Sequence, residues 1–368
     1  MDPASPRHSP AIGHAFNKGG STVINTGGFI MKITAIGIDL AKTVFQVHGE
    51  NSRGKTILTK RLSRAKLLPF LANIPPCLIG LEACGGSNYW ARQIKSLGHD
   101  VRLISPQYVK PYVKTNKNDY NDAAAICEAV SRPDMRFVSI KTIQQQDIQT
   151  LHRIRTRLIR ERTAIVNQTR GILLEFGIFF PTSINAFRRE VPLLLEDAEN
   201  ALSTVARDIV AEQYADLLQL DAKVQRYEKR INKVFKDYPV CQRLAKVEGV
   251  GPLIATAMVA AVGDATTFKN GRQMAAWLGL VPRQHSSGNH NRLLGISKRG
   301  DTYLRTLLIH GARSVVFRCE SKRDRKSRWL TSLKKRRGVN RTSVALANKN
   351  ARVLWALMAK DEQYLQSA

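Results

Sequence analysis

Four acidic residues sit where an α/β domain could gather them around a divalent metal ion. Asp39 ends the apolar run at residues 33–38, and Glu82 ends a second apolar run at residues 77–81. Asp119 and Asp122 lie three residues apart at the start of a helical pattern, so they share one helix face. Mg²⁺ and Mn²⁺ accept carboxylate ligands, and such ions activate and stabilise phosphodiester exchange. We therefore expect a metal-dependent phosphodiester site made of these four side chains.

A plainer interpretation of the same acids stays open. A chain with 29 acidic residues places some of them at strand ends by chance. Asp is also common in first helical turns, because its charge complements the helix dipole.

The rest of the chain is strongly basic. It has 58 Lys and Arg against 29 Asp and Glu in 368 residues, a net charge of +29, with a pI near 10.3. This excess predicts nucleic-acid binding, and acids grouped on such a chain indicate a metal between protein and phosphate. The five dispersed cysteines lack zinc spacing and fit a reducing compartment. We expect the protein in the bacterial cytoplasm, associated with the nucleoid. No apolar stretch approaches the ~18–20 residues of a membrane span, so we expect no membrane contact.

Local patterns divide the chain into four parts. Residues 1–31 are rich in Gly, Ser, Pro and Asn and predict a disordered leader, native or added. Residues 32–140 carry strand patterns at 33–38, 44–48, 56–59, 77–82, 101–104 and 135–140, with helices at 89–97 and 119–130. Strands first, then alternating strands and helices, predict an α/β domain with a mixed sheet.

The third part, residues 141–240, is predicted to be helical. Its second helix spaces apolar residues by three and four, which is typical of a coiled-coil seam. The seam residues are Leu217, Leu220, Val224, Tyr227, Ile231 and Val234. This short seam fits equally an antiparallel helical pair inside one chain and a contact between subunits.

The last part, residues 241–368, is predicted to be mainly α-helical. The run at residues 244–255 has the form of a helix-hairpin-helix motif. Its Gly249 and Gly251 would let the backbone turn tightly and bring N–H groups close to a phosphate. An ordinary helix turn with glycine caps is the alternative.

Two polar stretches follow, a loop predicted at residues 279–290 and a basic turn that enters a helix at residues 296–305. Within them we expect four cations to contact phosphate groups: Arg283, Lys298, Arg299 and Arg305. Composition does not single out Ser286 or Ser287 as a nucleophile, because no His/Asp relay is evident nearby. His285 and His290 flank these serines, but a histidine in a polar loop is more often inert.

Taken together, these motifs resemble those of a known family. The matching stretches are residues 37–42 (GIDLAK), 79–85 (IGLEACG), 114–123 (KTNKNDYNDA), 249–252 (GVGP) and 277–283 (WLGLVPR). They run in the expected order from Met31 to about Lys360. The chain resembles the insertion-sequence transposases of the IS110 family, relatives of the Piv-type DNA invertases, and more narrowly their IS1111 branch.

The resemblance implies an RNase-H-like (RuvC-like) domain with a DEDD metal set, a coiled-coil linker and a C-terminal transposase domain. The four acids above take the catalytic, metal-binding positions, for Mg²⁺ or Mn²⁺. A serine nucleophile follows the Pro-Arg motif and precedes a glycine in this family. That position falls on Ser287, although a loop shift of one residue would exchange it with Ser286. The implied reaction is DNA strand exchange through a 5′-phosphoserine link.

The resemblance also implies partners. Family members are guided by a structured RNA from their own element, a bridge RNA that pairs with donor and target double-stranded DNA. The high positive charge suits the many phosphate contacts that an RNA and two DNA duplexes require. We expect a homodimer or homotetramer as the active form.

Three other functions stay open. A Holliday-junction resolvase or simple nuclease would use the same acids with water as the nucleophile. A Piv-type DNA invertase would differ in substrate arrangement more than in chemistry. A non-catalytic nucleic-acid-binding protein would use only the basic surface, and it would gain nothing from carboxylates beside phosphate.

Overall fold

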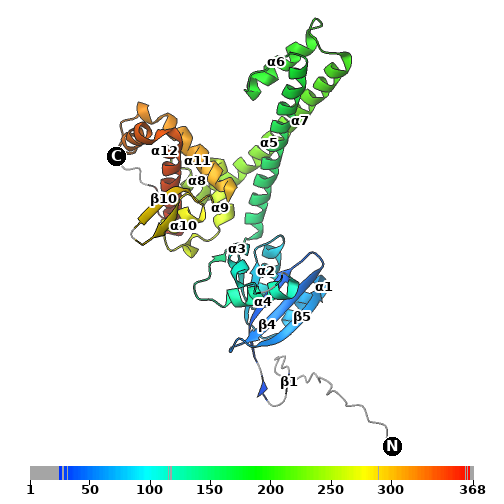
Figure 1. The fold of residues 1–368 in the computed structure, drawn as a ribbon, viewed down its shortest axis with the longest axis vertical. Helices are drawn as coiled ribbons and strands as arrows, with labels where there is room; N and C mark the ends of the chain where they lie inside the picture. Colours follow the sequence, from blue (N-terminus) through cyan, green and yellow to red (C-terminus); the bar gives the residue numbers. More distant parts are fainter. Residues whose placement is uncertain are drawn as a thin grey trace, which may run out of the picture. The chain divides into compact units, whose positions relative to one another are not determined.

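The computed structural model describes residues 25–26, 29–30, 32–114, 116, 118–288, 290–360, 362 and 364. The predicted leader lies outside these residues, apart from the short antiparallel strands β1 (Asn25–Thr26) and β2 (Phe29–Ile30). The chain forms two compact units, the first up to Thr142 and the second from Ile143. Figure 1 shows the order of their helices and strands.

A mixed six-stranded sheet forms the centre of the first unit, with strand order β5-β4-β3-β6-β7-β8. The strands are β3 (Ile33–Leu40), β4 (Val44–Asn51), β5 (Thr56–Ser63), β6 (Leu78–Glu82), β7 (Asp100–Ile104) and β8 (Phe137–Val138). Strands β3, β4 and β5 form an antiparallel meander, whereas β3, β6 and β7 are parallel and β8 is antiparallel to β7.

Helices cover both faces of this sheet. On one face, Ile36, Ile79 and their neighbours pack against α1 (Arg64–Ala72) and α2 (Ser87–Ser96). On the other face lies α4 (Asp119–Val130), with α3 (Pro106–Val109) and the 3₁₀ turn η1 (Lys110–Tyr112). The predicted mixed α/β arrangement is confirmed. Helix α1 was not predicted from the sequence, and it carries Pro69 in its interior, which ordinarily disfavours a helix.

The second unit begins with a long helical pair, α5 (Ile143–Glu175) and α7 (Thr204–Asp237), joined through α6 (Ile184–Glu196). Leu220 and Val224 of the predicted seam pack against Leu158 of α5, so part of the seam is buried within the chain. The helices run in opposite directions, because Arg155 pairs with Glu228 whereas the later Arg162 pairs with the earlier Asp221.

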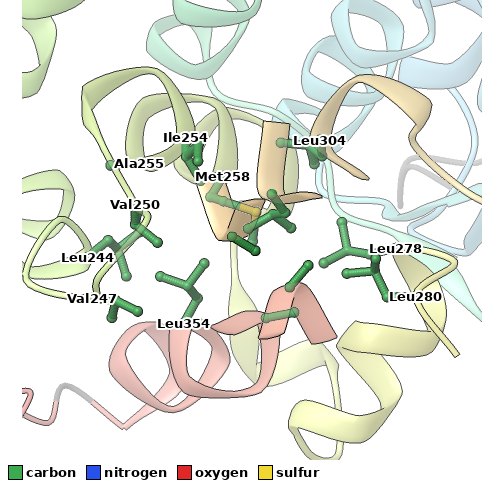
Figure 2. Packing of buried hydrophobic residues seen from close by; sticks show 14 of the residues in the cluster. Leu244, Val247, Val250, Ile254, Ala255, Met258, Leu278, Leu280, Leu304 and Leu354 are labelled. Atoms are coloured by element: carbon green, nitrogen blue, oxygen red, sulfur yellow. The ribbon is translucent and has the colours of Figure 1, made fainter. Parts of the chain in front are cut away.

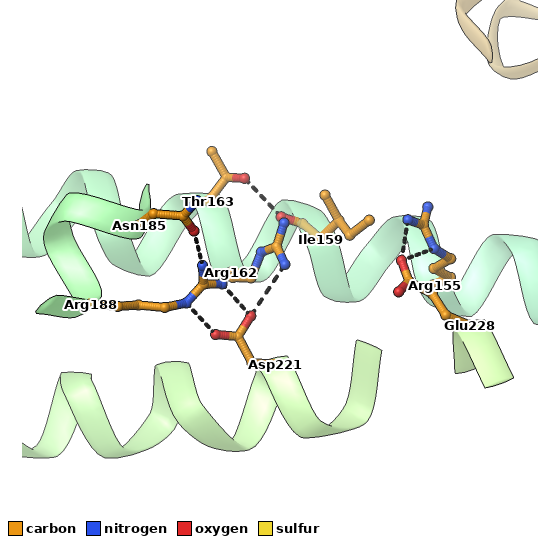
Figure 3. A network of polar contacts seen from close by, with 8 residues as sticks. All are labelled: Arg155, Ile159, Arg162, Thr163, Asn185, Arg188, Asp221 and Glu228. Carbon is orange, nitrogen blue, oxygen red and sulfur yellow. Dashed lines mark hydrogen bonds and ion pairs between the residues drawn. The ribbon is translucent and has the colours of Figure 1, made fainter. Parts of the chain in front are cut away.

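Asp221 also ties α6 to this pair (Figure 3). Its two carboxylate oxygens accept hydrogen bonds of 2.7 Å from Nε and Nη2 of Arg188, and one of them accepts a third from Arg162 at 3.2 Å. A two-pronged arginine–carboxylate contact fixes direction as well as distance. One acid on α7 therefore holds three helices in register.

The remaining helices pack around one apolar core (Figure 2). They are α8 (Pro239–Leu244), α9 (Pro252–Val262), α10 (Gly271–Trp277), α11 (Thr302–Phe317) and α12 (Arg325–Ala359), with the 3₁₀ turns η2 (Ala265–Thr267) and η3 (Cys319–Ser321). Met258, Leu278 and Leu354 are among its fully buried members. The predicted mainly helical C-terminal region is confirmed. Within the described residues, none of the helices combines the length and apolar character needed to cross a bilayer.

His152 joins α5 to this core. Its side chain is buried, and its ring nitrogens contact Tyr303 Oη at 2.8 Å and Thr256 Oγ1 at 2.9 Å. Thr256 Oγ1 donates its proton to Pro252 O at 2.7 Å, so it accepts from the imidazole, which in turn accepts from Tyr303. Only the neutral ring can donate once and accept once. Burial, assisted by the positive charge of Arg155, lowers the pKa of His152 to about 4.

We predict that this histidine makes the protein less stable at acid pH. Its folded pKa of about 4 lies below the ordinary value of 6.5, so the unfolded chain binds the extra proton between these two pH values. The stabilisation is complete above pH 6.5 and is lost as the pH falls towards 4, by about 3 kcal/mol. Urea unfolding across this range should show a steeper acid loss for the wild type than for His152→Gln. Equal slopes in the two proteins would contradict the assignment.

Candidate active site

Asp39 and Glu82 lie at the C-terminal ends of two adjacent parallel strands, β3 and β6. Ile38 of β3 is in register with Leu81 of β6, and the two acids are the next residues. In-register neighbours on parallel strands point to the same sheet face, so these carboxylates project side by side. Burial raises the pKa of the Cys84 thiol, and the negative charges of Glu82 and Asp39 raise it further. Both acids therefore act on one small region at this edge of the sheet.

Two glycines identify the face to which these acids point. Gly37 and Gly80 lie two residues before Asp39 and Glu82, and so on the same face of the sheet. A Cβ at Gly37 would collide with the backbone of α4 at Ala123 and Cys127, and one at Gly80 would lie 2.8 Å from Val130 Cβ. Helix α4 thus packs directly on the face that carries both acids.

Asp119 and Asp122 occupy the first turn of α4, as predicted. Asn118 caps this helix, since its side chain accepts a hydrogen bond of 2.8 Å from the N–H of Asn121. The ring of Tyr120 lies edge-on to His48, which is the β4 neighbour of Gly37, with ring centroids 5.7 Å apart. The first turn of α4 therefore lies over the β3–β4 part of the sheet, on the acid-bearing face.

The four acids share this face without forming a closed ligand cluster. Among the residues that the structure describes, no three His, Cys, Asp or Glu side chains are close enough to hold a metal ion. Asp122 is half-buried and Asp119 is exposed at the helix start. As a donor set, oxygen-only carboxylates suit a hard divalent cation such as Mg²⁺.

The predicted polar loop at residues 279–290 is wrong. The chain instead forms a β-hairpin from β9 (Pro282–Ser287) and β10 (His290–Ile296). Every residue of β9 is exposed, so the strand has no apolar alternation by which it could be recognised. The available signal was the short turn at Gly288, whose φ of +54° favours glycine.

The hairpin separates the two candidate serines. Ser287 lies at its tip opposite His290, and His285 lies opposite Arg292. Because strand residues alternate, Ser287 shares its face with these three side chains. Ser286 points to the opposite face and accepts a hydrogen bond of 3.0 Å from Gln284 Nε2. The imidazoles are thus neighbours of Ser287 and not of Ser286.

The four cations predicted to contact phosphate differ in their placement. Arg283 lies on the exposed strand β9, and Lys298 and Arg299 are exposed in the turn before α11. Arg305 is only 7% exposed. Its guanidinium donates to Leu278 O at 3.2 Å, to Arg299 O at 3.1 Å and to Thr302 Oγ1 at 3.0 Å. Arg305 therefore secures the base of the hairpin, a position that does not suit contact with phosphate.

The predicted glycine turn between α8 and α9 is present. Gly249 has φ of +84°, and a Cβ on it would lie 2.7 Å from Gly311 O of α11. Its glycine identity thus serves close backbone packing. Gly251 caps α9, with open space where a side chain would start. Glu248 holds the turn from outside, and hydrogen bonds from Lys322 and Lys326 lower the pKa of its carboxyl.

Comparison with known proteins gives consistent matches. Residues 36–178 match the model of the DEDD domain of IS110 elements, described as a transposase, and residues 241–328 match that of the transposase IS116/IS110/IS902 family. The chain is 50% identical over 341 residues to a probable family 20 transposase of Pseudomonas aeruginosa, covering 91% of this chain and 99% of that protein. It is 48% identical over 332 residues to the transposase for insertion sequence element IS1111A of Coxiella burnetii, covering 90% and 91%.

We predict that Gly37→Ala displaces α4 and destabilises the first unit. The new methyl group would meet the α4 backbone, which cannot move aside as a flexible side chain could. We expect a loss of about 3 kcal/mol or more, as in overpacked cores. Gly85→Ala is the matched control, because nothing lies within 4 Å of its Cβ position. Thermal unfolding measures both, and equal melting temperatures would show that the close approach is not required.

Proposed function

The chain belongs to the IS110/IS116/IS902 family of transposases, and from this premise we propose that it excises and inserts a mobile DNA element by serine-mediated strand exchange. One observation carries the proposal: the two family matches together include all five residues to which we assign the chemistry. The match at residues 36–178 contains Asp39, Glu82, Asp119 and Asp122, and the match at residues 241–328 contains Ser287. The strand order of the first unit, an antiparallel meander followed by parallel strands, supports an RNase-H-like assignment.

We assign Mg²⁺ or Mn²⁺ binding to the four acids. The oxygen-only donor set and the side-by-side projection of Asp39 and Glu82 support this assignment. The first-turn acids of α4 lie on the same face and would supply the remaining ligands. When bound, the ion would offset negative charge on the scissile phosphate and on the leaving oxygen.

Ser287 is the proposed nucleophile. Its Oγ attacks the phosphorus of the scissile phosphodiester, an Oγ–P bond forms, and the bond from phosphorus to the 3′-oxygen breaks. The hydroxyl proton passes to His285 or His290, the imidazoles on the same hairpin face. The imidazolium then gives this proton to the 3′-oxygen, which leaves as a hydroxyl. The product is a 5′-phosphoserine. A 3′-hydroxyl from a second strand then reverses the step, so rejoining needs no external energy source.

The partners follow from charge and kinship. A net charge of +29 suits extensive contact with double-stranded DNA and with a structured guide RNA, which we propose as the source of target choice. The acids and the serine must act at the same phosphate, and a homodimer or homotetramer could supply them from different subunits. The site of action would be the bacterial nucleoid.

A covalent-trapping assay tests this proposal. Protein, labelled element-junction DNA, the element's non-coding RNA and Mg²⁺ are mixed and separated on a denaturing gel. We expect a protein–DNA adduct in the wild type and in Ser286→Ala. Ser287→Ala should lower adduct formation roughly 10³-fold or more, because the attacking atom is removed. Asp39→Ala should also abolish it. Ser286→Ala is the matched control, since its hydroxyl points to the other hairpin face.

The other outcomes identify the alternatives. Cleavage without an adduct, unaffected by Ser287→Ala, would contradict the serine mechanism and indicate a resolvase-like metal nuclease. Tight binding with no cleavage by any form, under conditions in which a relative is active, would indicate a nucleic-acid-binding protein. An adduct whose DNA ends are rejoined in inverted orientation would indicate a Piv-type invertase.

A further inference from the structure

Residues of helix α12 line a cavity of about 450 Å³ that the proposed reaction does not use. Its lining consists of three cations and one aromatic ring: Arg325, Lys326, Lys349 and Trp329. We infer that this cavity binds an unpaired nucleotide of a single nucleic-acid strand. The base would stack on Trp329 and the adjoining phosphate would meet the cations. The inference goes beyond the proposed strand exchange and requires neither the four acids nor Ser287.

A break in α12 creates the cavity. Trp329 and Lys349 are 20 residues apart and would be separated by about 30 Å along a straight helix. Gly338 has φ of +76° and ψ of +169°, which interrupts the helix. The two halves therefore meet, and Lys349 Nζ lies 5.1 Å from the centroid of the Trp329 ring. Only glycine adopts this backbone conformation without strain.

The charge of the cavity favours an anion. Lys326 is paired with Glu248, which lies in the turn before α9. Arg325 and Lys349 have no acidic partner within ion-pair distance among the residues that the structure describes. Of the described residues that line the cavity, none is acidic. A phosphate would neutralise these two cations, whereas an uncharged ligand would leave both uncompensated.

The aromatic ring adds a requirement that phosphate alone does not meet. Trp329 is half-buried, and Lys349 Nζ lies over one face of its ring in a cation–π contact. A base that stacks on this face would displace the ammonium group towards the adjoining phosphate. Flat bases stack on such rings, and the combination of aromatic faces with cations is how single strands are bound without sequence choice. A nucleotide supplies both the flat ring and the negative charge.

A second cavity continues the first. It has a volume of about 540 Å³ and shares Lys349 with the first. Its other lining residues are Arg352, Tyr364, Glu362 and the apolar Val353, Ala356 and Leu357. The carboxylate of Glu362 is paired with Lys360 at 3.5 Å, so its charge is partly offset. Each cavity therefore has one aromatic ring and at least one cation other than the shared Lys349. A strand could pass from Trp329 to Tyr364 with Lys349 between two successive nucleotides.

Fluorescence anisotropy with labelled 12-residue strands tests the inference without any cleavage step. We expect the wild type to bind oligo-dT about tenfold more tightly than an abasic strand of equal length. Trp329→Leu should remove this preference, and Trp329→Phe should restore most of it. Lys349→Ala should lower the salt dependence of binding by about one phosphate contact. Lys233→Ala, which removes an exposed cation of α7, is the charge-matched control.

Oligo-U alongside oligo-dT distinguishes the source of the strand. If one of the two strands binds more tightly, and Trp329→Leu removes that difference, the inference is supported. A preference for oligo-U then assigns the site to RNA, and a preference for oligo-dT assigns it to DNA. An unchanged preference for bases in Trp329→Leu would overturn it. So would competition by inorganic polyphosphate as strong as that by oligo-dT, because the cavity would then bind anions only. Lys349 is exposed, so we expect Lys349→Ala to fold like the wild type. Its effect on binding therefore tests the site independently of the Trp329 variants. This binding assay involves neither Ser287 nor cleavage, so its failure can be distinguished from failure of the covalent-trapping assay.

Discussion

The close backbone contact between α4 and the sheet is the constraint on which the candidate metal centre depends. Gly37 and Gly80 have no side chains, so the helix lies directly on the strands that end in Asp39 and Glu82. Larger residues at the glycines would lift the helix, and with it the acids of its first turn. The proposed metal site therefore depends on two glycines that have no reactive group. Each lies two positions before a strand acid, and both let α4 pack against the sheet.

The same device recurs around the hairpin that carries the proposed nucleophile. The backbones at Gly279 and Arg299 approach each other closely, and so do those at Gly300 and Trp277. The guanidinium of Arg305 joins the two loops from which β9 and β10 depart. An exposed two-stranded ribbon has little stability of its own, so its base must be fixed. Buried polar contacts and glycines perform that task, which leaves the ribbon surface free for polar residues.

Sequence reasoning found those elements whose local signals agree with their tertiary roles. The strand ends at Asp39 and Glu82 and the capped start of α4 were predictable because apolar runs and a helix-start pattern mark them. The β9–β10 hairpin was missed because every residue of β9 is exposed and the strand has no apolar alternation. The inward orientation of Arg305 was missed because sequence does not reveal which arginine a tertiary contact will bury. The break at Gly338, too, depends on how the two halves of α12 pack.

Binding of Mn²⁺ followed by electron paramagnetic resonance tests the central claim most directly, because it does not require DNA, RNA or turnover. We expect four substitutions to weaken Mn²⁺ binding about tenfold or more each, since each removes a charged ligand: Asp39→Asn, Glu82→Gln, Asp119→Asn and Asp122→Asn. Glu128→Gln should bind like the wild type, because this α4 acid is paired with Lys114 and Arg132. Wild-type affinity in both α4 variants, Asp119→Asn and Asp122→Asn, would contradict a site built jointly from strand ends and helix start.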